Sequence, residues 1–389
     1  MASERPGATE MSLLLNDEQR MLRDSAQQFL AERSPVAALR GLRDRHDANG
    51  YDPALWREIA ELGWPAAVLP EAYGGLGVGY QGLATVFEQL GRTLAATPLL
   101  SGVVLGGGLL LDAGSEAQRA AWLPRVATGE VLLALALEES PRHDPARVAL
   151  RADRRDGGWR LDGTKEFVLD GHVAERLVVV ARSAGAPGET EGLSLFLVDP
   201  KVAGVSVQRI TMVDSRNAAR VHLDGVTVGD EVLIGQAGQC GATLERVLDR
   251  ARLCLAAESL GVINEAFDRT LAYLKERVQF EVPIGSFQAL QHRAARLFVE
   301  IELLKSCVAA ATEAVDEGTA DAPSLVSLAK ARASDLSEKA LNEAVQLHGG
   351  IGVTDEFDLG LYLKRARVLQ QTFGDGAFHR NRYARLRGF

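Results

Sequence analysis

The spacing of apolar residues changes twice along the chain and divides it into three parts. From Leu13 to Pro124 apolar side chains recur every three or four positions, which predicts amphipathic helices. From Val131 to Leu233 short apolar or alternating runs end in turn pairs such as Asp162-Gly163, which predicts strands. Helical spacing returns after Gly241. The pattern indicates an α, β, α succession, and the short strands favour a compact β-barrel.

The longest helical pattern runs from Ala242 to Val278 without a proline, and it predicts a helix on the order of 50 Å long. Tyr273, Arg277 and Phe280 follow each other at spacings of four and three, so we expect them to share one face at its end. Proline and glycine then break the run, and a helix restarts at Phe287. An arginine here also suits the helix dipole without any ligand.

Three further helices are expected, at Phe287–Glu317, Ser324–His348 and Leu359–Leu369. The second one stops at the glycine pair Gly349-Gly350. A glycine at this place either supplies the left-handed residue that ends a helix or lets a diphosphate approach the backbone. The sequence alone leaves both interpretations open.

Composition excludes several classes of function. The net charge of -9 argues against binding to a phosphate backbone as the main task. No stretch is long and apolar enough to span a membrane, and the first residues lack an apolar signal region, so a cytoplasmic protein is expected. The cysteines and histidines have no metal-ligand spacing, so no metal site is expected.

Three strings carry a resemblance to one family. The first, Y-x3-R-x-Q-F-x2-P-I-G-x-F-Q-A-x-Q from Tyr273 to Gln291, resembles a signature of the acyl-CoA dehydrogenases, flavin enzymes that desaturate acyl thioesters. The string P-E-x-Y-G-G-x-G from Pro70 resembles their N-terminal domain, and Q-L-H-G-G-I-G from Gln346 resembles their second FAD-diphosphate signature. The resemblance runs from about Leu13 to Arg385.

The resemblance implies a multidomain α+β fold: an N-terminal helical domain (1–126), a middle β-barrel domain (127–234) and a C-terminal four-helix-bundle domain (235–389). It also implies FAD as the cofactor, an acyl-CoA or other acyl thioester as the substrate, and an electron-transfer flavoprotein or a similar acceptor. The expected assembly is a homo- or hetero-oligomer built as a dimer of dimers.

The resemblance assigns cofactor contacts to two groups of residues. Members of the first group bind the dinucleotide, in part across a subunit boundary: Arg277, Gln279, Phe280, Phe287, Gln288, Gln346, His348, Gly349 and Gly350. Members of the second group lie near the flavin ring: Leu137, Phe167 and Leu169. The ring-side residues depart from the family, because Phe167 replaces a tryptophan and Leu169 replaces a threonine whose hydroxyl bonds near N5.

The catalytic base is the main departure. Family enzymes use a carboxylate to remove the α-proton of the thioester while the β-hydride goes to the flavin. The usual glutamate position reads Phe373 here, and the alternative position, on the long helix directly before Arg252, reads Ala251. Both positions lack a carboxylate.

Three explanations compete. Asp375 lies two residues past the first empty position, in T-F-G-D-G-A-F-H-R, which resembles a bacterial subgroup. Glu258 lies two helical turns after Ala251 and needs either a partner or a raised pKa. In the third explanation, the chain is the subunit without a catalytic base in a two-subunit assembly, or it no longer desaturates any substrate.

The leading hypothesis is an FAD-dependent acyl-CoA dehydrogenase that forms an α,β-unsaturated acyl thioester. Asp375 is the expected base, with Glu258 second, and Arg252 shapes the region around it. The alternatives are a non-catalytic partner subunit of a heteromeric acyl-CoA dehydrogenase, and a flavin oxidase or monooxygenase on the same fold.

Overall fold

The N-terminal part of the chain is helical in the computed structural model, which describes residues 15–389. The first helix begins after Asn16, because Asn16 and Gln19 cap each other's backbone N–H groups. Leu13 and Leu14, where the pattern begins, lie outside the described residues. The elements of this part are α1 (Asp17–Arg33), α2 (Val36–Asp44), α3 (Pro53–Glu61), η1 (Trp64–Ala66), η2 (Glu71–Tyr73), α4 (Gly79–Thr93), η3 (Leu100–Gly107), α5 (Gly108–Ala113) and α6 (Glu116–Ala127).

The middle part is one curved sheet with a hydrophobic core of its own. Its strand order is β6-β7-β3-β2-β4-β5-β8, and β1 pairs in parallel with β4. The edge strands β6 and β8 do not pair with each other within residues 15–389, so the sheet is an open barrel. The strands are β1 (Leu133–Ala136), β2 (Arg151–Arg155), β3 (Gly158–Leu169), β4 (Arg176–Arg182), β5 (Leu193–Val198), β6 (Val205–Thr211), β7 (Asn217–Gly229) and β8 (Leu233–Ile234), with η4 (Asp230–Val232) before the last.

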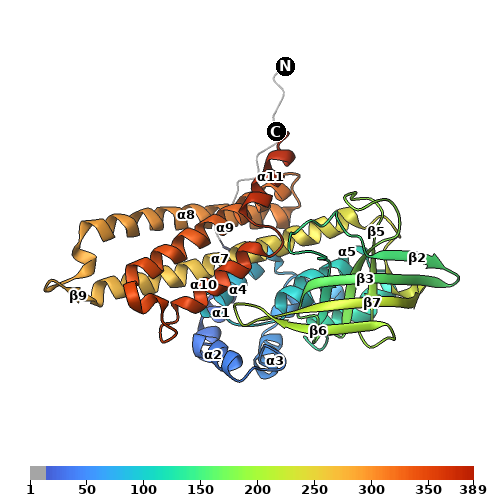
Figure 1. Ribbon diagram of the computed structural model, residues 1–389, viewed down its shortest axis with the longest axis horizontal. Helices are drawn as coiled ribbons and strands as arrows, with labels where there is room; N and C mark the ends of the chain where they lie inside the picture. The colour runs from blue at the N-terminus through green and yellow to red at the C-terminus, as the bar shows by residue number, and fades with distance from the viewer. Residues whose placement is uncertain (1–14) are drawn as a thin grey trace, which may run out of the picture.

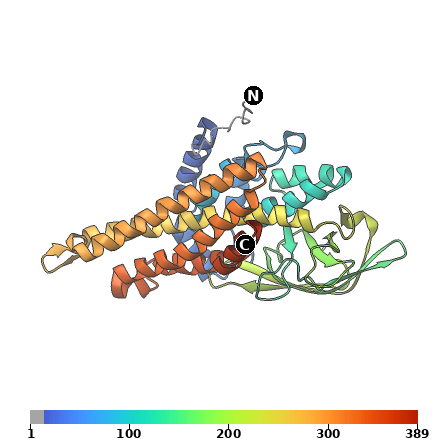
Figure 2. The same cartoon turned by 90° about the horizontal axis from the view of Figure 1, so that it is seen from above.

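The C-terminal part is a bundle of long helices that extends away from the sheet (Figures 1 and 2). The longest, α7 (Gly241–Glu276), runs from the sheet to the far end of the bundle, which places it against all three parts (Figure 1). The others are α8 (Gln288–Glu317), α9 (Ala322–His348), α10 (Leu359–Gln371) and α11 (Gly376–Leu386), with η5 (Ile284–Ser286) and η6 (Gly349–Val353) between them. Among the described residues, no helix has the length and apolarity needed to cross a membrane.

The end of α7 differs from the prediction. The helix stops at Glu276, and a hairpin of β9 (Val278–Gln279) and β10 (Val282–Pro283) follows. Phe280 lies at the hairpin tip with a φ of 54° and is 87% exposed. The prediction that Phe280 shares a helix face with Tyr273 is therefore wrong, because the chain leaves the helix before it reaches Phe280.

Candidate functional site

One end of the bundle brings the arginine motif and the glycine motif together within the same chain. The rings of Tyr273, on α7, and His348, the last residue of α9, stack with centroids 4.5 Å apart and planes 27° apart. The ring of Phe357 also packs against this imidazole, with centroids 4.8 Å apart. Because both helix ends are fixed by this stack, Arg277 and the glycine pair stay at one end of the molecule.

The groups at this end suit an anionic ligand. Gly349 has a φ of 64° and a ψ of -142°, a conformation that residues with a Cβ rarely adopt. No heavy atom lies within 4 Å of where a Cβ on Gly349 or Gly350 would stand, so the backbone is open to approach. Arg277 and Gln346 are exposed, and Arg277 makes no salt bridge to a described residue. A cation, an amide donor and an open backbone fit a dinucleotide diphosphate.

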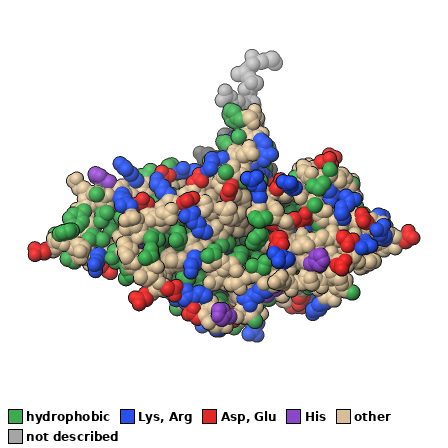
Figure 3. Space-filling view, in the orientation of Figure 1, with side chains coloured by type: hydrophobic (Ala, Val, Ile, Leu, Met, Phe, Trp, Pro, Cys, Tyr) green, Lys and Arg blue, Asp and Glu red, His purple; other side chains and the backbone are tan. Residues whose placement is uncertain are grey.

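The other predicted dinucleotide contacts lie on the adjoining hairpin and the start of α8. Gln279, Phe280, Phe287 and Gln288 are all exposed, and the two phenylalanine rings meet edge to face at 6.3 Å. Hydrophobic side chains gather on this end of the surface (Figure 3). The arrangement leaves these residues available to a neighbouring subunit.

A cavity of about 460 Å³ lies between the sheet and α10. Phe167 and Leu169 from β3 form one wall, and Val368, Thr372 and Phe373 form the facing wall. Leu137 is buried and does not line the cavity, and its carbonyl accepts a hydrogen bond of 3.0 Å from Lys165. The cavity is mostly apolar and suits a flat ring, but Leu169 gives it no hydroxyl donor.

The two vacant base positions lie beside Arg252, which is fully buried. Its Nε donates to the carbonyl of Phe373 at 3.2 Å, and its Nη1 donates to Asp249 and Glu245, both at 2.9 Å. Burial disfavours its charge, but the two carboxylates outweigh this and raise the pKa of Arg252. Arg252 therefore holds the loop in which Phe373 stands at the position of the family's glutamate.

Sequence reasoning missed a carboxylate and a histidine in the cavity wall. His143 Nε2 lies 2.9 Å from Arg252 Nη2, and its Nδ1 lies 2.5 Å from Glu138 Oε1. Arginine only donates, so Nε2 accepts and the proton sits on Nδ1, toward Glu138. Both residues line the cavity, where Glu138 is the one carboxylate among the described lining residues. Both residue types are visible in the sequence, but their pairing is not.

The loop that carries Phe373 is fixed from several sides. His379 Nε2 lies 3.1 Å from the Phe373 carbonyl, and buried Lys330 donates to the carbonyls of Leu369 and Gly374, both at 2.9 Å. Phe373 itself has a φ of 54°, a strained value for a residue with a side chain. Such strain persists because the surrounding hydrogen bonds over-determine the loop.

Neither predicted base faces the large cavity. The carboxylate of Asp375 is the N-cap of α11 and accepts a hydrogen bond of 2.8 Å from the N–H of Phe378. Glu258 is buried and accepts two hydrogen bonds of 2.8 Å from Arg365. Burial disfavours its ionisation, but Arg365 and Arg216 outweigh it and lower the pKa of Glu258. Of the two possibilities for Glu258, the partner is confirmed and the raised pKa is wrong.

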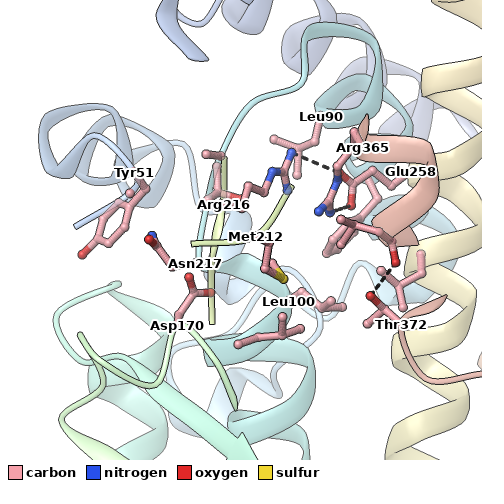
Figure 4. Close-up of a pocket in the computed structure, with 17 residues that line it drawn as sticks. Tyr51, Leu90, Leu100, Asp170, Met212, Arg216, Asn217, Glu258, Arg365 and Thr372 are labelled. Atoms are coloured by element: carbon pink, nitrogen blue, oxygen red, sulfur yellow. Dashed lines mark hydrogen bonds and ion pairs between the residues drawn. The ribbon is translucent and has the colours of Figure 1, made fainter. Parts of the chain in front are cut away.

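A second, smaller cavity of about 40 Å³, which we call the chamber, adjoins the first (Figure 4). The two share the lining residues Leu169, Met212, Val368 and Thr372. Asp170 lies in its wall with a hydrogen bond of 2.6 Å from the hydroxyl of Ser101. Burial raises the pKa of Asp170 to about 6.

Comparison with known proteins gives one consistent result. Family models described as the N-terminal, middle and C-terminal domains of acyl-CoA dehydrogenase match residues 16–130, 135–226 and 241–386. Acyl-CoA dehydrogenase IpdE2 of Mycolicibacterium smegmatis is 32% identical over 364 residues, which cover 92% of this chain and 96% of that protein. Mitochondrial isovaleryl-CoA dehydrogenase of Solanum tuberosum is 29% identical over 379 residues, which cover 96% and 91%. The solved ChsE4-ChsE5 complex from Mycobacterium tuberculosis aligns with a TM-score of 0.86 at 26% identity and covers 96% of this chain and 98% of that one.

Proposed function

This chain belongs to the acyl-CoA dehydrogenase family, whose members bind FAD, and we propose that it is one subunit of a heteromeric acyl-CoA dehydrogenase. In this proposal the chain contacts the dinucleotide part of an FAD that is bound in a neighbouring, homologous subunit. The neighbour carries the carboxylate base and forms the α,β-unsaturated acyl thioester. An electron-transfer flavoprotein or a similar acceptor then reoxidises the assembly.

The observation that carries the proposal is the contrast between the two ends of the site. The dinucleotide end keeps its arginine, its glutamine and an open glycine pair beside the stack of Tyr273 on His348. The base end holds Ala251 and Phe373, Glu245 and Asp249 are hydrogen-bonded to Arg252, and Glu138 is paired with His143. A chain that binds a neighbour's cofactor but does not itself remove the proton needs an intact dinucleotide end. It does not need a carboxylate at the base end.

The residues at the dinucleotide end have separate tasks. FAD, when bound, supplies the hydride acceptor of the reaction. Arg277 neutralises diphosphate charge, Gln346 donates a hydrogen bond from its amide, and Gly349 leaves the backbone accessible. Phe280 and Phe287 supply apolar surface to the subunit contact. One relative is known as a complex of ChsE4 with ChsE5, which supports a mixed assembly on this fold.

Co-expression tests the proposal. The chain is produced alone and together with a homologue that has a glutamate at the position of Phe373, and each purified sample is assayed for flavin absorbance and for acyl-CoA oxidation with an artificial electron acceptor. We expect stoichiometric flavin and turnover in the mixed complex alone. An Arg277→Gln change in this chain should then lower flavin retention by the mixed complex. Full flavin content and turnover by the chain alone would overturn the proposal.

A self-sufficient dehydrogenase is the second candidate, because Glu138 does bring one carboxylate to the large cavity. In that case the chain alone oxidises acyl-CoA, and Glu138→Gln abolishes turnover while flavin absorbance remains. A flavin oxidase or monooxygenase gives a third outcome, which is oxygen consumption without an added electron acceptor.

A further inference from the structure

Charged groups surround the chamber and pair with one another. Arg365 bonds to Glu258 and donates to Asp214 at 2.8 Å, and Arg216 Nη2 lies 3.2 Å from Glu258. Two guanidinium groups therefore face Glu258 and Asp214, and Asp170 adds a third carboxyl group, so the chamber has no spare cation. An additional negative charge in the chamber would have no counter-ion and would lie close to Glu258 and Asp170.

Hydrogen-bonding groups remain available around this network. The Nε of Arg216 is buried and has no hydrogen-bond partner among the described residues. Asp170 uses one carboxyl oxygen toward Ser101, and the side chains of Tyr51 and Thr97 bring hydroxyl groups to the same wall. Asp170 and Arg216 lie in the wall of the chamber (Figure 4). The chamber thus offers an unsatisfied donor and nearby acceptors in a space of about 40 Å³.

The chamber adjoins the large cavity, where the resemblance places the flavin ring, and in this family the acyl group lies beside that ring. Leu169, Met212, Val368 and Thr372 separate the two spaces, and each of these side chains belongs to both linings. A hydrocarbon tail that entered the chamber would leave the Arg216 N–H unpaired, and a tail that ended in a carboxylate would add the uncompensated charge. An uncharged oxygen atom meets neither penalty.

We infer that the chamber recognises a hydroxyl or carbonyl oxygen borne on the acyl group, so that this chain binds oxygenated acyl thioesters in preference to plain fatty acyl thioesters. Arg216 donates to the ligand oxygen, and Asp170 accepts from a ligand hydroxyl. The inference rests on the proposed function only in taking an acyl thioester as the ligand that lies beside the flavin ring. It holds whether or not this subunit carries out the chemistry.

Calorimetric titration without turnover tests the inference on the purified protein, alone and in the mixed complex. The probes are matched CoA thioesters of equal chain length that are unsubstituted, hydroxylated at successive carbons, or terminated by a carboxylate. We expect the best hydroxylated probe to bind roughly tenfold more tightly than the unsubstituted one, the usual effect of satisfying a buried donor. Equal or tighter binding of the unsubstituted or carboxylate probe, or binding of none, would overturn the inference.

An Arg216→Lys variant keeps the positive charge beside Glu258 and removes the Nε–H. We expect it to lose most of the preference for the hydroxylated probe, measured as the ratio of its affinities for the hydroxylated and the unsubstituted probe. Arg154→Lys, at an exposed site paired with Asp230, serves as the matched control and should retain the preference. A preserved preference in Arg216→Lys contradicts the assignment. Because no turnover is measured, this result is independent of whether the chain alone proves active.

Discussion

Both carboxylate oxygens of Glu258 lie 2.8 Å from guanidinium nitrogens of Arg365, in a bidentate ion pair that joins α7 to α10. The side chains are 3% and 7% exposed, so water screens the pair little. Such a pair is costly to desolvate, and the removal of one partner costs still more, because it leaves the other charge buried and unpaired. The pair closes the chamber on the side away from the sheet and fixes the two helices that line it.

Replacing one partner of this pair should destabilise the chain strongly. We expect Glu258→Ala to lower the free energy of unfolding by about 3–5 kcal/mol, because two buried guanidinium groups lose their shared carboxylate. The double change Glu258→Leu with Arg365→Met should cost clearly less, because it leaves Asp214 and Arg216 as a balanced remainder. Urea unfolding of the isolated chain measures both. If the double variant were the less stable of the two, the pair would have a net stabilising role instead.

Asp170 should make stability depend on pH between about 4 and 6. Its pKa rises from 3.8 in the unfolded chain to about 6 in the folded chain, so the folded chain binds more protons in this range and the unfolding free energy falls as pH rises. The loss is complete above pH 6 and amounts to about 3 kcal/mol at most. Asp170→Asn removes it, so its stability relative to the parent should rise from pH 4 to pH 7. A difference between variant and parent that stays constant over this range would contradict the raised pKa.

Two substitutions at Asp375 distinguish a helix-capping role of this residue from a catalytic one. Asparagine caps a helix as well as aspartate does, whereas alanine costs about 1 kcal/mol. We therefore expect Asp375→Asn to keep both stability and turnover of the mixed complex, and Asp375→Ala to lose stability alone. Thermal unfolding and acyl-CoA oxidation are measured on the same samples. A loss of turnover in Asp375→Asn with unchanged stability would restore Asp375 as the base.

Alanine substitutions at Gly349 and Gly350 test the role of the glycine pair, because only Gly349 has a positive φ. Gly349 has a φ of +64°, whereas Gly350 lies outside the left-handed region, and neither has a heavy atom within 4 Å of the place that a Cβ would occupy. We expect Gly349→Ala to cost about 1–2 kcal/mol of stability and to weaken flavin retention, because alanine resists this backbone conformation. Gly350→Ala is the matched control for stability. Flavin absorbance after gel filtration of the mixed complex reports retention, and equal behaviour of the two variants would remove the special role of Gly349.

The periodicity of the sequence located the helices well, because each long helix buries a continuous apolar stripe. The predicted range Ala242–Val278 corresponds to α7 at Gly241–Glu276, and Ser324–His348 corresponds to α9 at Ala322–His348. The prediction failed at Phe280, where a two-residue ladder replaces the last helical turn. The spacing of residues in the sequence cannot distinguish a last helical turn from a short hairpin, since the same residues are compatible with both.

The sequence by itself determined the α, β, α order, the family relation and the absence of a carboxylate at Ala251 and Phe373, because each of these depends on residue types at fixed positions. Only the tertiary structure decided what the remaining carboxylates do. Glu138 pairs with His143, which in turn contacts Arg252, Glu258 pairs with Arg365, and Asp375 caps α11. The physical reason is that the pKa and the role of a carboxylate depend on the charges and hydrogen-bond donors within a few ångströms of it. Some of these neighbours, such as Arg252 and Arg365, come from segments that lie far away in the sequence.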